Sequence, residues 1–245
     1  MNRLPAQYPA MAARAHDVVV SPPACRPGIR ETGYRAGIAA FAATLAYVAA
    51  QMAQVAGALR PPLDGILIYA ASLCIVVPFV LEMLALHHLT VGEARFWTNA
   101  AVIFTTIYAV FVTANYVVQL ATVIPATLRG TDESIRLLVQ TPHSMFWDYD
   151  GIGYIAMGFV TLCAIPALSR TGIERWVRLA FIANVLVTPL IAVVYFYPTF
   201  SIALLFIGLP WAVTAPMSML LLAIALRRRS APSRVSFEPA EHGAS

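Results

Sequence analysis

Long apolar runs separated by short polar breaks form the main pattern along this chain. A helix of about 20 apolar residues crosses the roughly 30 Å hydrocarbon core of a bilayer and satisfies its own backbone hydrogen bonds. The runs that reach this length cover residues 36–59, 66–87, 99–124, 152–169, 177–197 and 200–226. We therefore predict an all-α fold, a polytopic bundle of six transmembrane helices.

The breaks between the runs differ in strength. Residues 59–65 form a Pro/Gly turn, and residues 87–95 and 169–175 are polar connections. The break before residue 200 has no charged residue and only Pro198 to mark it, so one bent helix is the main alternative to two spans there. The connection between the third and fourth runs is long. Within it, residues 131–139 have the pattern of a short amphipathic helix at the membrane surface.

Arginine positions predict the orientation of the helices. The chain has no lysine, and 13 of its 16 arginines lie on one side of the membrane if the N-terminus is inside. Short cytoplasmic segments retain positive charge, so both termini are predicted to be cytoplasmic. Residues 35–229 then form the transmembrane domain. The flanking tails, residues 1–34 and 230–245, are rich in Pro, Ser and charge, which predicts disorder.

Composition excludes several classes of protein. Hydrophobic residues make up 60% of the chain and charged residues 11%, far from the usage of soluble domains. The absence of lysine excludes a lysine Schiff base. The net charge of +4 gives no reason to expect nucleic acid, because Arg227, Arg228 and Arg229 at a helix end suit anionic lipid headgroups. The bilayer is the expected partner, in a bacterial inner membrane, and a homo- or hetero-oligomer is left open.

Polar side chains gather near the outer ends of three predicted helices. Such groups are costly in lipid, so their positions indicate candidate sites. If the first, third and fourth helices are neighbours, these groups line an outward-opening polar pocket. The alternative is that the amides only join helices by hydrogen bonds. The pocket candidates are Gln51, Gln54, Asn115, Gln119, His143, Asp148, Asp150 and Tyr154.

Two of these candidates are carboxylates in the aromatic stretch FWDYDG, residues 146–151. We place both ahead of the first turn of the fourth helix, where the helix dipole favours negative charge, so capping accounts for one of them. Trp147 and Tyr149 suit the membrane boundary without any further role. Asp150, facing the amides of the third helix, is the stronger functional candidate.

A second polar group lies near the inner face. Glu82 precedes the end of the second helix by about five residues, and its candidate partners are Arg95, Asn99 and Asn184. One interpretation is an interfacial glutamate whose carboxylate reaches the membrane surface. The other is a residue that handles protons or binds headgroups.

The runs NYVVQLATVIPATLRG, residues 115–130, and TPHSMFWDYDGIGYIAMG, residues 141–158, resemble a group of uncharacterised bacterial multipass membrane proteins. The resemblance covers the third and fourth helices. It implies that Asn115, Gln119, His143, Asp150 and Tyr154, together with Gly153, belong to one unit, and it implies no activity.

Three functions stay open at this point. The first, which we favour, is binding or transport of a small molecule or lipid through the outward-facing pocket. The second is an intramembrane enzyme that uses Asp148 or Asp150 as acid or base beside His143. The third is a structural or regulatory membrane subunit. No nucleophile motif, metal-ligand spacing or phosphate loop is present in the sequence, so we expect no metal and no cofactor.

Overall fold

The structure is a computed structural model, and it describes residues 27–229. Throughout this range the regular structure is helical, and six segments are long and apolar enough to cross a membrane. The elements are α1 (Pro27–Val55), α2 (Leu63–His88), α3 (Ala94–Val118), η1 (Gln119–Val123), α4 (Ile124–Leu128), η2 (Asp132–Leu138), α5 (Met145–Ala164), η3 (Ile165–Ala167), α6 (Gly172–Phe196), α7 (Ile202–Gly208) and α8 (Trp211–Arg228). The predicted all-α bundle of six spans is confirmed.

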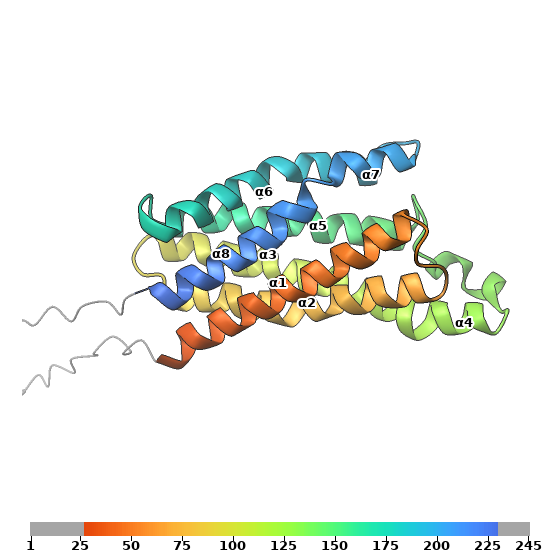
Figure 1. Ribbon diagram of the computed structural model, residues 1–245, viewed down its shortest axis with the longest axis horizontal. Helices are drawn as coiled ribbons and strands as arrows, with labels where there is room; N and C mark the ends of the chain where they lie inside the picture. Colours follow the sequence, from red (N-terminus) through yellow and green to blue (C-terminus); the bar gives the residue numbers. More distant parts are fainter. Residues whose placement is uncertain (1–26, 230–245) are drawn as a thin grey trace, which may run out of the picture.

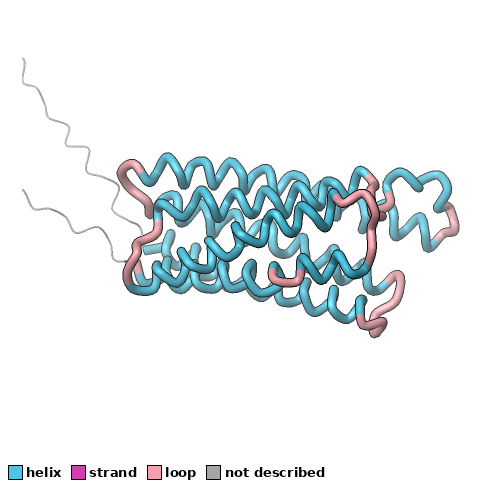
Figure 2. The backbone as a smooth tube through the Cα atoms, turned by 90° about the horizontal axis from the view of Figure 1, so that it is seen from above, coloured by secondary structure: helices cyan, strands magenta, loops and turns pink. Residues whose placement is uncertain are grey.

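The six spans form a closed ring. α1 packs on α2, α2 on α3, α3 on α5, α5 on α6, α6 on α8, and α8 returns to α1. Figures 1 and 2 show an elongated bundle in which α1 begins and α8 ends at the same end of the molecule. We call this the proximal end, and the opposite one the distal end. An even number of spans requires this arrangement, and it agrees with the prediction that both termini lie on one side.

Hydrogen bonds join the segments at the proximal end. Arg30 Nη1 in α1 donates to the carbonyl oxygen of Arg229, at 2.7 Å. The Arg229 guanidinium forms a salt bridge with Glu174 of α6, Nε to Oε1 2.7 Å, and donates to the carbonyl oxygen of Ala167, Nη2 to O 2.8 Å. A third contact reaches Thr90 Oγ1 at 3.5 Å. One arginine thus connects the ends of four helices.

Large apolar side chains cover the outside of the ring. Examples with more than half of their surface exposed come from four of the six spans: Leu63, Val77, Ile103, Val110, Trp176, Leu186, Phe206 and Val213. A soluble bundle would bury such residues, whereas lipid solvates them. The protein is a multipass membrane protein on this evidence and on the length of its helices.

The first helix starts earlier than predicted. It begins at Pro27, so residues 27–34, assigned above to the N-terminal tail, are helical. Proline suits the first position of a helix, and Glu31 and Arg35 form an i, i+4 salt bridge at 2.6 Å. Hydropathy detects only the apolar part of a helix, which explains the error. The rest of the predicted tails, residues 1–26 and 230–245, lies outside the described range.

The fourth span also starts earlier, at Met145 instead of residue 152. Ser144 is its N-cap, and the Ser144 hydroxyl accepts a hydrogen bond from the backbone N–H of Trp147, at 3.2 Å. The prediction that Asp148 and Asp150 precede the helix is therefore wrong. Asp148 lies in the first turn, and Asp150 lies about half a turn further along the helix.

The third span is longer than predicted and changes geometry near its distal end. α3 passes into the π-helical turn η1 and then into α4, which ends at Leu128. Pro125 removes one backbone donor in this region, and in membrane helices a local π-helical adjustment can re-satisfy backbone groups that a proline leaves free. The segment after it contains η2, a short 3₁₀ helix over Asp132–Leu138, close to the predicted surface helix at residues 131–139.

The predicted weak break before residue 200 is real. α6 ends at Phe196, and α7 begins at Ile202 after a turn. The sixth span is itself interrupted at Leu209 and Pro210, between α7 and α8. In Figure 1 α7 lies beside α6, and α8 runs at an angle to α7.

Glycines allow α5 to pack closely against α3 and α6. A Cβ at Gly153 would lie 2.7 Å from Val112 Cγ2 of α3, and a Cβ at Gly158 would lie 2.0 Å from Thr188 Oγ1 of α6. Small residues at such positions let membrane helices approach each other. α5 is accordingly the most buried of the six spans.

Candidate functional site

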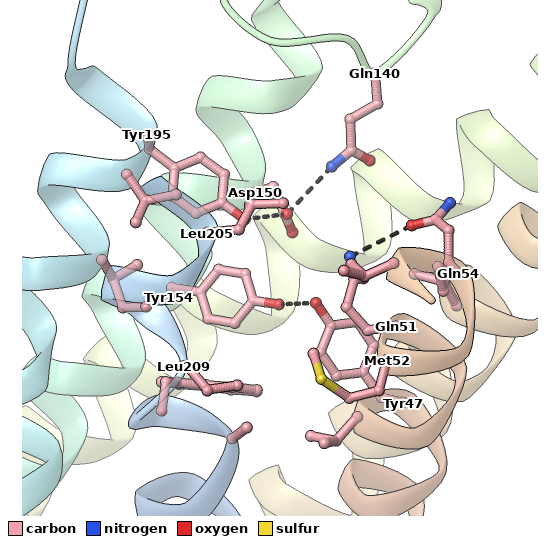
Figure 3. Close-up of a pocket in the computed structure, with 18 of the residues that line it drawn as sticks. Tyr47, Gln51, Met52, Gln54, Gln140, Asp150, Tyr154, Tyr195, Leu205 and Leu209 are labelled. Carbon is pink, nitrogen blue, oxygen red and sulfur yellow. Dashed lines mark hydrogen bonds between the residues drawn. The ribbon is translucent and has the colours of Figure 1, made fainter. Parts of the chain in front are cut away.

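A cavity of about 270 Å³ lies in the distal half of the ring. Its walls come from α1, α2, α5, α6, α7 and α8, with one residue each from α3 and the segment before α5. The polar and aromatic lining residues are Tyr47, Gln51, Gln54, Tyr69, Tyr116, Gln140, Trp147, Asp150, Tyr154, Tyr195 and Trp211. Figure 3 labels seven of these side chains, which converge from segments far apart in the sequence: Tyr47, Gln51, Gln54, Gln140, Asp150, Tyr154 and Tyr195.

Among residues 27–229, Asp150 is the one acidic residue in the wall of this cavity, and it is only 4% exposed. Tyr116 donates its hydroxyl to Asp150 Oδ1 at 2.5 Å. Tyr195 donates to Oδ2 at 2.6 Å, and Gln140 Nε2 donates to the same oxygen at 3.1 Å (Figure 3). All three donors are neutral, and both salt bridges found between residues 27 and 229 lie elsewhere. The carboxylate is therefore held by hydrogen bonds and has no cationic partner in the described part of the chain.

Helical geometry separates the two carboxylates. Asp148 and Asp150 are two residues apart, so they point about 200° apart around α5. Asp150 faces the inside of the ring, whereas Asp148 is half-buried and outside the cavity lining. Asp148 lies in the first turn of α5, where its charge suits the positive end of the helix dipole. Of the two, only Asp150 belongs to the site.

Tyr47 and Tyr154 meet across the ring below Asp150. Their hydroxyl oxygens are 2.5 Å apart, which joins α1 to α5 (Figure 3). Trp211 of α8 packs edge-on against both rings, with centroid distances of 5.9 Å to Tyr47 and 4.7 Å to Tyr154. These three aromatic side chains form the floor of the cavity and separate it from the proximal half.

The amides of the third span hold the segment before α5 in place. Gln119 Nε2 donates to the carbonyl oxygen of Leu138 at 2.7 Å, and Gln119 Oε1 accepts from the backbone N–H of Gln140 at 3.2 Å. Asn115 Nδ2 donates to Gln140 Oε1 at 3.0 Å. Neither amide lines the cavity; together they orient Gln140, which contacts Asp150.

The structure thus divides the predicted pocket residues. Gln51, Gln54, Asp150 and Tyr154 line the cavity. Gln54 Nε2 donates to Asp64 Oδ2 at 2.9 Å, so part of its polar group is occupied. Asn115, Gln119 and Asp148 lie nearby without lining it, and His143 is exposed in the turn before α5, with a positive φ of 65°. His143 makes no contact that would let it act as acid or base beside Asp150.

The order of the helices in the ring differs from the condition on which the pocket prediction rested, namely that the first, third and fourth spans are neighbours. α1 packs on α2 and α8, not on α3. α3 and α5 are neighbours, and α1 faces α5 across the ring through the Tyr47 and Tyr154 hydroxyls. The cavity is therefore built across the ring and not in a groove between three adjacent helices.

Several residues of the site have no signal in the sequence. Tyr69, Tyr116, Tyr195, Trp211 and Gln140 line the cavity, yet none is among the predicted candidates. Tyr195 stands in an apolar stretch at a helix end, where aromatic residues commonly mark the membrane boundary. A tyrosine that faces the lumen of the ring and one that faces lipid look alike in sequence.

The inner-face candidates are also divided. Glu82 and Asn184 are buried and line one small cavity, whereas Arg95 and Asn99 are exposed. Glu82 has no solvent exposure and no salt bridge to Arg95. The interpretation of Glu82 as an interfacial residue is wrong, because its side chain points into the ring instead of toward the membrane surface.

The described residues contain no group of three or more His, Cys, Asp or Glu side chains arranged to hold a metal ion. No protein-family model, characterised protein or solved structure matches this chain.

Proposed function

We propose that this protein binds a small organic cation with an apolar body in the distal cavity, as a binding protein or transporter of a bacterial inner membrane. The observation that carries the proposal is Asp150, a buried carboxylate in the cavity wall with three neutral hydrogen-bond donors and no cationic partner among residues 27–229. Charged groups at membrane depth are costly unless they are paired, so a bound cation would supply the missing partner.

The aromatic lining supports the same class of ligand. Five tyrosines and two tryptophans surround the cavity, and aromatic faces attract ammonium groups. Apolar residues such as Ile191, Val194 and Leu205 complete the wall and suit a hydrocarbon body. The volume of about 270 Å³ is close to the lower end of the range for small-molecule sites. These features favour a compact ligand over a whole two-chain lipid.

The position of the lining residues supports entry from the lipid side. Met52 and Val55 of α1 and Leu209 after α7 line the cavity and are each more than 40% exposed. α1 and α7 do not pack extensively against each other. An amphiphilic cation could therefore reach Asp150 between these two helices, from the leaflet at the distal end.

The distal end is proposed to face the outside of the cell. Within residues 27–229 nine arginines lie toward the proximal end, and only Arg60, Arg129 and Arg136 lie at the distal one. A fluorescent reporter that folds only in the cytoplasm, fused after Ser245, is expected to be bright, and alkaline phosphatase at the same position is expected to be inactive. The reverse pattern would contradict this orientation and indicate that the cavity faces the cytoplasm.

The ligand class can be tested with three compounds of similar size and different charge. We expect phenyltrimethylammonium to raise the melting temperature of the purified full-length protein in a saturable manner. Its neutral isostere tert-butylbenzene and the anion benzoate are expected to have little effect. An equal rise with tert-butylbenzene would show that charge is irrelevant, and a rise with benzoate alone would exclude a cation site.

A further inference from the structure

Glu82 is a second buried carboxylate, and its surroundings differ from those of Asp150. Its side chain on α2 has no exposed surface, and neither carboxylate oxygen has a hydrogen-bond partner in the described part of the chain. Asp150, by contrast, accepts three hydrogen bonds. An unpartnered carboxyl group inside a membrane bundle is costly in its charged form, so it calls for a specific explanation.

The carboxyl group of Glu82 lines a small cavity in the proximal half of the ring. The cavity has a volume of about 10 Å³, room for no more than about one water molecule. Its polar lining residues are Thr161 of α5, Asn184 of α6 and Ser218 of α8. On the α1 side, Gly37 leaves space for the carboxyl group, because a Cβ at this position would lie 2.3 Å from Glu82 Oε1.

The two hydroxyl groups in this cavity donate their hydrogens to backbone carbonyl oxygens. Thr161 Oγ1 donates to the carbonyl oxygen of Gly158 at 2.9 Å, and Ser218 Oγ donates to that of Thr214 at 2.7 Å. Asn184 Nδ2 donates to Thr161 Oγ1 at 3.3 Å, not to Glu82. The two hydroxyl oxygens therefore offer lone pairs to the cavity. Neither hydroxyl donates to Glu82, so neither stabilises a carboxylate there.

We propose that Glu82 is a proton-binding site. A proton taken up on one carboxylate oxygen makes the group neutral, and its release restores the carboxylate. Thr161 and Ser218 line the same cavity, but neither is hydrogen-bonded to the carboxyl group. No oxidation or reduction is involved. The remaining lining residues, from α2, α5, α6 and α8, are Phe79, Met157, Phe181, Ala215, Met219 and Leu222, and α1 contributes Gly37. No other acidic or basic side chain of the described residues faces this group.

A second small cavity has residues in common with both carboxylate sites. It has a volume of about 10 Å³, and Asp150, Tyr47 and Tyr154 line it. Met157 lines this cavity and also the cavity of Glu82. The proton site itself does not depend on which ligand occupies the distal cavity.

Infrared difference spectroscopy of the full-length protein in lipid nanodiscs can test the assignment. A protonated carboxyl group has a C=O stretch well separated from carboxylate bands. We expect wild type at neutral pH to show a protonated-acid band that disappears at alkaline pH. The band should be absent in Glu82→Gln and retained in Asp150→Asn. No such band in wild type, or an unchanged band in Glu82→Gln, would overturn the proposal.

Two further measurements keep the test decisive if Glu82→Gln does not fold. Ser218→Ala and Thr161→Val each replace a polar group of the cavity wall with an apolar one, and each is expected to move the band to higher frequency, because the carboxyl group then lies in less polar surroundings. A band that stays in place in both variants would count against the site. Replacing KCl by NaCl at constant pH should leave the band in place. Loss of the band in NaCl would identify the ligand as Na⁺ and overturn the proton assignment.

Discussion

Replacing Asp150 by Asn is expected to abolish most of the affinity for an organic cation. The substitution keeps the size of the side chain and an oxygen that can accept from Tyr116 or Tyr195, so the bundle should remain folded. It removes the only acidic group that the described residues contribute to the cavity wall. Losing one member of a buried charge pair costs about 2–5 kcal/mol, which corresponds to a loss in affinity of roughly 30-fold or more. Binding of phenyltrimethylammonium by titration calorimetry measures the loss.

Asp148→Asn is the matched control for this experiment. It makes the same chemical change on the same helix, two residues away and outside the cavity. We expect its affinity to equal that of wild type. Equal losses in both variants would attribute the effect to the general charge of the distal end, and undiminished binding by Asp150→Asn would rule out the proposed role of this carboxylate.

Replacing Gly158 by Ala is expected to destabilise the bundle strongly. In most helices this change stabilises by about 0.5–1 kcal/mol, because alanine has the better helix propensity. Here the new Cβ would lie 2.0 Å from Thr188 Oγ1 and 2.5 Å from Thr188 Cγ2, so α5 and α6 would have to move apart. Overpacking of this kind costs typically about 1–3 kcal/mol. The melting temperature in detergent should therefore fall, opposite to the effect of helix propensity.

Two variants show whether the contact with Thr188 is the cause. Gly28→Ala lies on α1, where a Cβ would meet nothing within 4 Å, and it is expected to leave the melting temperature unchanged or slightly raised. Thr188→Ala removes both of the closest atoms and should restore part of the stability of Gly158→Ala. If the double variant melts no higher than Gly158→Ala, the α5–α6 contact at this position is not as close as described.

The candidate site shows which local sequence patterns predict that a residue lines the cavity and which do not. Asp150 could be singled out because a carboxylate at membrane depth is rare, and the structure places it in the cavity wall. Asn115 and Gln119 also stood out as polar residues, but their amides hold Gln140 and the adjacent backbone instead of lining the cavity. A polar residue in a span signals that some partner exists. Its identity depends on which loop folds back over the helix end.

Glu82 shows the same limit at the other end of the bundle. Its place near a helix end suggested that it reaches the membrane surface. The orientation of its side chain depends on the rotation of α2 within the ring, and this rotation is set by packing against α1 and α3. The groups that surround it come from α1, α5, α6 and α8, and no local pattern relates these helices to α2.

The amino-acid sequence by itself determined the class of protein, the six spans and the shared side of the two ends. These features follow from the unfavourable free energy of placing unpaired backbone groups and charges in lipid. Each segment of the chain must avoid this free-energy penalty separately, so its own composition reveals it. Only the tertiary structure decided the order of helices in the ring, the separation of Asp150 from Asp148, the tyrosines around the cavity and the unpartnered state of Glu82. These features depend on how helices rotate and pack against one another, and such contacts join residues that are distant in sequence.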